Sequence, residues 1–76
     1  MNAENRKDLQ KAFDLIEEAK NIIAEVKDGE QEKFDNLSEG LQATEKGQKF
    51  EETVSTLEDV ESSLEEAQGN IETAME

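Results

Sequence analysis

The last third of the sequence repeats every seven residues. From Phe50 it reads FEETVST, LEDVESS, LEEAQGN and the incomplete IETAME. The first residue of each repeat is large and apolar and the fourth is small or β-branched, so these positions form an apolar line along a helix. A period of seven predicts left-handed supercoiling against another helix. In this segment the line comprises Phe50, Thr53, Leu57, Val60, Leu64, Ala67, Ile71 and Ala74.

A matching line runs through the first half of the chain, where large apolar residues again alternate with small ones at spacings of three and four. It comprises Leu9, Ala12, Phe13, Ile16, Ala19, Ile23 and Val26, with Leu15 and Ile22 widening it. Such a stripe is typical of an amphipathic helix. We call the two apolar lines together the core seam, and we expect them to face each other, with the small residues allowing close approach.

The turn between the two helices is indicated by a loss of this spacing. Proline is absent from the chain, and the regular pattern fails only between Asn36 and Gly47. We therefore expect an all-α fold, a two-helix antiparallel hairpin in a single domain. Its expected parts are residues 1–76 for the domain, about 3–35 for the first helix, about 36–44 for the turn and about 45–74 for the second helix.

Polar residues interrupt the core seam late in the first helix. Glu30 and Lys33 fall where the pattern would otherwise face the second helix. They form either a frayed, solvated stretch beside the turn, which we favour, or a polar layer that sets the register of the helices. The helix itself is expected to continue through Gly29, because Phe34 and Leu37 resume the spacing.

The chain is short for a protein that must form its own core. It has 76 residues, of which 33% are hydrophobic and 38% charged, and its net charge is -13. This balance is close to that of disordered chains, but the periodic placement of the apolar residues favours folding. We expect a homodimer that forms a four-helix bundle; a lone hairpin that docks onto a different protein is the alternative.

The composition argues against catalysis. The chain has no Cys and no His, so the common nucleophile and base pairs cannot be built, nor can thiolate or histidine metal sites. Its many carboxylates are expected on solvent-facing positions, where they are not tuned for acid and base work. We expect no enzymatic activity, no cofactor and no metal.

Charge and hydropathy also limit the partners. No apolar run approaches the ~20 residues needed to cross a bilayer, and the segment Met1 to Asp8 is polar. We expect a cytoplasmic protein without membrane association. A charge of -13 repels phosphate backbones, so direct nucleic-acid binding is not expected, whereas a basic protein surface would be attracted.

The negative charge is concentrated in the second helix, because all Lys and Arg residues lie at or before Lys49. Seven acids there follow the large seam residues, mostly in pairs one heptad or about 10 Å apart. We call this set the acidic ridge: Glu51, Glu52, Glu58, Asp59, Glu65, Glu66 and Glu72. The ridge is either a solvated face that pairs with Lys20, Lys27 or Lys33 across the hairpin, or an imitation of nucleic-acid phosphates that occupies a basic cleft.

The turn region resembles that of a family. The sequence EQEKFDNLSEGLQ from Glu30, followed by TEKG from Thr44, resembles the turn of small acidic helical proteins encoded by bacteriophages and prophages. The basic stretch from Asn5 to Lys7 and the LEE sequence from Leu64 match the ends of that family. The resemblance implies a phage or prophage origin and a bacterial host cytoplasm, and it implies no known activity.

The positions that carry the resemblance are Phe34, Asp35, Asn36, Leu37, Leu41, Gln42 and Gly47. We expect Phe34, Leu37 and Leu41 to plug the end of the bundle, and a recognition tip is the alternative. The sequence therefore predicts a non-enzymatic interaction or structural module. An acidic nucleic-acid mimic that inhibits a host DNA-binding or defence protein is the alternative function.

Overall fold

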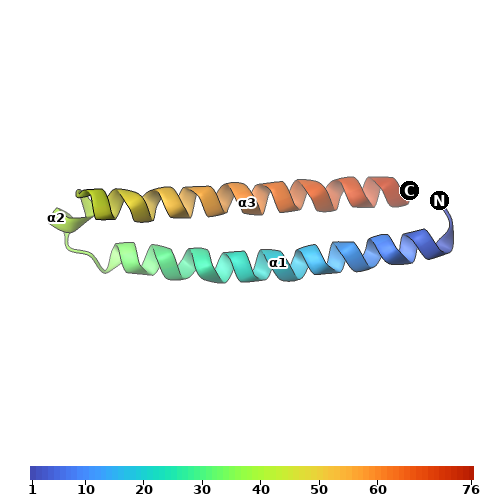
Figure 1. Ribbon diagram of the computed structural model, residues 1–76, viewed down its shortest axis with the longest axis horizontal. Coiled ribbons are helices and arrows are strands. Elements are labelled where there is room, and N and C mark those ends of the chain that lie inside the picture. The colour runs from blue at the N-terminus through green and yellow to red at the C-terminus, as the bar shows by residue number, and fades with distance from the viewer.

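The computed structural model describes residues 1–76 as two long helices that lie side by side and are joined at one end (Figure 1). In chain order the helices are α1 (Ala3–Asp35), α2 (Glu39–Gln42) and α3 (Glu45–Met75). The molecule is a rod of 58 × 15 × 12 Å. The prediction of an all-helical antiparallel hairpin is confirmed, and the expected turn contains the additional four-residue helix α2.

Local sequence accounts for the start and the continuity of α1. The side chain of Asn2 accepts a hydrogen bond of 2.7 Å from the backbone N–H of Asn5, which satisfies a donor that the first turn of a helix leaves free. The helix runs without a break through Gly29 to Asp35, as expected. Because the seam residues on both sides of Gly29 belong to one stripe, packing against α3 outweighs the weak helix propensity of glycine.

Two contacts hold the short helix α2 against the ends of the long helices. The side-chain amide of Gln42 donates a hydrogen bond of 3.1 Å to the carbonyl of Phe34 near the end of α1. Gly47 lies in the first turns of α3 and is buried, and a Cβ atom at this position would overlap the backbone carbonyl of Gln42. The absence of a side chain at Gly47 therefore lets the end of α2 pack directly on α3.

α1 and α3 meet along a line that is shifted by one residue from half of the predicted core seam. The first residue of each heptad faces the partner helix as expected. At the second seam position, however, the fifth residue of the heptad lies nearer to the partner helix than the predicted fourth residue. On α1 these fifth residues are Phe13, which the predicted seam already includes, and Lys20, Lys27 and Phe34. Val26 is exposed, whereas Ala12 and Ala19 stay half-buried. On α3 they are Val54, Glu61, Gln68 and Met75. Ala74 is exposed, whereas Thr53, Val60 and Ala67 stay half-buried.

This shift has a physical cause. Rotating α1 toward Phe13 and Phe34 turns two aromatic rings toward α3, which is a larger apolar area than three small side chains supply. The lysines between them keep their ammonium groups at the edge of the interface while their aliphatic stems cover apolar surface. The other predicted seam residues, Leu9, Ile16, Ile23, Phe50, Leu57, Leu64 and Ile71, are half-buried between the helices.

The hairpin has no buried hydrophobic side chain, and only Gly47 and Gln68 are buried at all. Several predicted positions are wrong. Leu15 and Ile22, which widen the predicted seam, are 56% and 59% exposed. Val26, placed in the core seam, is 48% exposed because it lies on a flank of the interface. Leu41, expected to help plug the end of the bundle, is 49% exposed. Two helices in contact can cover only one side of each other.

Candidate interaction surfaces

A polar cluster lies in the interface between α1 and α3. Gln68 is only 5% exposed. Its amide nitrogen donates to the carboxylate of Glu17 at 2.9 Å and to the carbonyl of Phe13 at 3.3 Å, and its oxygen accepts from the ammonium of Lys20 at 3.0 Å. The hydrogen bond from Gln68 and the charge of Lys20 lower the pKa of Glu17. Every polar group of Gln68 is thus used to join the two helices.

A second polar contact follows one heptad away. The ammonium of Lys27 lies 2.7 Å from the carboxylate of Glu61, and both side chains are about three-quarters covered. Hydrogen bonding to Glu61 raises the pKa of Lys27. A step of seven residues forward on α1, from Lys20 to Lys27, matches a step of seven backward on α3, from Gln68 to Glu61. These two contacts therefore mark one antiparallel register.

The polar interruption seen in the sequence has a different role from the one we favoured. Glu30 is half-buried and accepts a hydrogen bond of 3.2 Å from Lys33, three residues along the same helix. Because α1 is regular there, a frayed stretch is wrong. Polar residues also lie between the helices at Lys20 and Lys27, and neither position was predicted for the core seam. Their heptad spacing from Phe13 was the available signal.

The acidic ridge lies along the outer part of α3, and all seven of its side chains are exposed. Only Glu65 has a basic partner, Lys20, with 3.6 Å between nitrogen and oxygen. Of the cross-hairpin pairs that the sequence suggested, Lys27 reaches Glu61, which is outside the ridge, and Lys33 pairs within α1. The other six carboxylates of the ridge therefore face solvent without an ion pair.

The predicted turn residues divide into two groups. Phe34, Leu37 and Gln42 are half-buried and Gly47 is buried, whereas Asp35, Asn36 and Leu41 are exposed. Asn36 is the C-cap of α1, and its N–H donates to the carbonyl of Glu32 at 3.0 Å. The structure brings Phe34, Gln42 and Gly47 together and leaves Leu41 at the surface. The turn thus works as a closed joint between the long helices.

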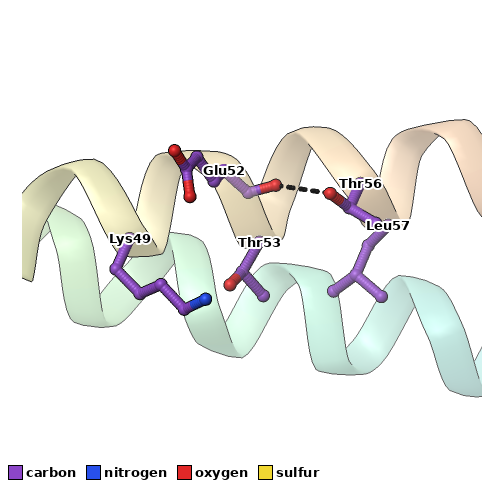
Figure 2. A pocket seen from close by; sticks show the side chains of 5 residues that line it. All are labelled: Lys49, Glu52, Thr53, Thr56 and Leu57. Atoms are coloured by element: carbon purple, nitrogen blue, oxygen red, sulfur yellow. Dashed lines mark hydrogen bonds between the residues drawn. The ribbon is translucent and has the colours of Figure 1, made fainter.

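The surface hollows are open and belong to α3 alone. One of about 280 Å³ is lined by Lys49, Glu52, Thr53, Thr56 and Leu57. Figure 2 shows these side chains along one helix, with the hydroxyl of Thr56 donating to the carbonyl of Glu52 at 2.8 Å. A second hollow of about 330 Å³ adjoins it and is lined only by polar residues. Neither hollow brings together groups from both long helices.

Two further features bear on binding. No three acidic side chains converge into a group that could hold a metal ion. The helices are also too polar along their length for any of them to cross a bilayer.

No protein-family model, curated protein or solved structure matches this chain. The resemblance to phage and prophage proteins therefore stays a prediction.

Proposed function

We propose that this chain is a non-enzymatic protein–protein interaction module that completes its fold by self-association into a four-helix bundle. One observation carries the proposal: the hairpin buries no hydrophobic side chain, and it leaves Leu15, Ile22 and Val26 48–59% exposed. Ordering each residue costs roughly 1.5 kcal/mol before burial offsets it, so a hairpin with no sealed interior needs a further surface. A second copy of the same chain can supply that surface.

The test is the molar mass of the purified protein in solution. Light scattering at low and high salt, with circular dichroism on the same samples, should report a helical dimer in both conditions. The asparagine double variant Leu57→Asn with Leu64→Asn should lose helix and dimer together, because both side chains lie between α1 and α3. A helical monomer at every concentration would overturn the proposal.

The second candidate function is an acidic mimic of nucleic acid, and the exposed ridge favours it. Six of its seven carboxylates have no basic partner, so a complementary basic cleft would meet no competing cation. Ridge pairs one heptad apart repeat at about 10 Å along the helix. Phosphates in a nucleic-acid strand are spaced more closely, so contacts would be made with alternate or more distant phosphate sites.

The two functions separate under one set of substitutions. Neutralising four ridge residues with Glu58→Gln, Asp59→Asn, Glu65→Gln and Glu66→Gln should leave dimer and helix intact if the chain is an interaction module. A mimic would instead displace duplex DNA from a basic bacterial nuclease, most effectively at low salt, and these substitutions would abolish displacement. No displacement by the unchanged protein at low salt would exclude the mimic.

A further inference from the structure

One flank of the hairpin carries a second apolar stripe on α1. Its members follow the heptad spacing of three and four and lie beside the line that faces α3: Ala12, Leu15, Ala19, Ile22, Val26 and Gly29. Leu15 and Ile22 are 56% and 59% exposed, whereas the alanines are half-buried. The stripe contains no charge over 17 residue steps, or about 26 Å of helix.

α3 continues this uncharged surface. The residues at the matching heptad positions are small or hydroxylated: Thr53, Thr56, Val60, Ser63 and Ala67. Lys20 reaches both Glu17 and Glu65, so the acidic flanks of the two helices lie on the same side of the interface. In an antiparallel pair, the opposite flanks then also lie together. We call the combined uncharged flank the side face.

We propose that the side face binds the side face of a second copy of this chain, with the two loops at opposite ends of a four-helix bundle. This inference rests on the proposed function and adds the surface and the orientation. The accessible area of the hairpin is 5561 Å², whereas a compact protein of 8.5 kDa exposes about 4,650 Å². The excess, roughly 900 Å², is close to the ~800 Å² that each partner buries in a standard interface.

The stripe on α1 is complementary to itself when reversed. A two-fold axis crossing α1 between Lys20 and Asn21 would place Ala19 opposite Ile22 of the second copy and Leu15 opposite Val26. It would also place Ala12 opposite Gly29 at the ends of the stripe. Ala19 with Ile22 is a small residue against a large one, Leu15 with Val26 is a pair of large apolar residues, and Ala12 with Gly29 is a pair of small ones. An isologous dimer whose two-fold axis is perpendicular to α1 pairs residues in this reversed order.

Charge determines the orientation of the two copies. One heptad beyond Val26 the stripe continues to Lys33, and one heptad before Leu15 it continues to Asp8. The reversed arrangement brings Asp8 of one copy beside Lys33 of the other, twice per dimer. With the loops at the same end, Lys33 would instead lie near Lys33, together with Lys46 and Lys49 from both copies. Like charges at that end would oppose the dimer.

The test of the surface uses matched pairs of substitutions on α1. Leu15→Gln with Ile22→Gln should convert the dimer to monomer, whereas Glu18→Gln with Glu25→Gln, on the exposed outer side of the same helix, should leave it dimeric. Light scattering and sedimentation report the mass. If the first variant stays dimeric, the side face is wrong while self-association stands; if the unchanged protein is monomeric, the proposed function fails as well.

The orientation of the two copies is tested with substitutions at exposed residues, which leave the contact between α1 and α3 unchanged. Asp8→Lys or Lys33→Asp alone should weaken the dimer roughly tenfold, and the double swap should restore it. Because the chain has no Cys, the variant Gly40→Cys carries a spin label at that position only. Nothing lies within 4 Å of a Cβ atom there, so the substitution should fit. Labels in the dimer should lie more than about 45 Å apart. A separation below about 25 Å, or no rescue by the swap, would overturn the antiparallel arrangement.

Discussion

Gln68 is the residue on which the pairing of the two long helices depends most. It is the one buried polar side chain, and it bonds to a lysine, a glutamate and a backbone carbonyl of α1. Loss of a buried hydrogen-bonding group leaves its partners without a bond that water cannot fully replace. A polar layer of this kind also penalises any register in which its partners are displaced.

We predict that Gln68→Ala lowers the free energy of unfolding by about 1–3 kcal/mol. Gln48→Ala, an exposed position on the same helix whose side chain makes no hydrogen bond within the protein, should change it by less than about 0.5 kcal/mol. Urea unfolding followed by circular dichroism measures both. Equal effects of the two substitutions would show that the cluster around Gln68 does not stabilise the hairpin.

The lowered pKa of Glu17 predicts a stability difference that depends on pH. Because the folded-state pKa lies below the ordinary 4.5, ionised Glu17 stabilises the fold fully above about pH 4.5 and loses this effect as the pH falls through the lowered value. Thermal unfolding should therefore find Glu17→Gln less stable than the unchanged protein at pH 7, with the difference vanishing in acid. Glu18→Gln, on the exposed side, should show no such loss; a difference that persists at pH 2 would contradict the assignment.

At the scale of elements, the turn is specified by one close contact. Gly47→Ala should destabilise the hairpin by about 2 kcal/mol or more, because its Cβ atom would meet the backbone of Gln42, which cannot rotate away as a side chain can. Gly40→Ala should be neutral or stabilising by up to about 1 kcal/mol, since nothing lies within 4 Å of a Cβ there. The melting temperatures of both variants check this; an unchanged value for Gly47→Ala would mean that the loop moves freely.

The element boundaries were predictable because their causes are local. Asn2 caps a helix that begins at Ala3, and the loss of heptad spacing after Asp35 marks the turn. The rotation of the helices was not predictable by the same means. Ala12, Ala19 and Val26 form a more apolar line than Phe13, Lys20 and Lys27, and a rule that counts apolar residues selects the first.

The choice between these two lines depends on interactions that are distant in sequence. Lys27 lies in the interface because Glu61 stands opposite to it, and Lys20 because Gln68 does. Only the partner helix supplies that information. For the same reason the side face could not be recognised in advance: eight of its eleven residues belong to the predicted core seam.

For the molecule as a whole, unbalanced charge should oppose folding. The net charge is -13, and three of the four ion pairs have one solvent-exposed partner, so they contribute little. The Debye length falls from about 30 Å at 0.01 M salt to about 3 Å at 1 M, so added NaCl should screen repulsion more than it weakens attraction. The melting temperature should rise by several degrees over this range; a fall would mean that the ion pairs dominate.

A hairpin in which no hydrophobic residue is fully shielded from water has little of its own to keep it closed. If pairing with a second copy provides the missing protection, the fraction of chains that resist proteolysis will depend on how many are made, because association stabilises the folded state by mass action. At low synthesis most chains would be single and short-lived, and the protected fraction would rise gradually as the concentration passes through the dissociation constant of the dimer. Cellular abundance would then rise more than in proportion to gene expression, in the concentration range set by the dissociation constant of the dimer.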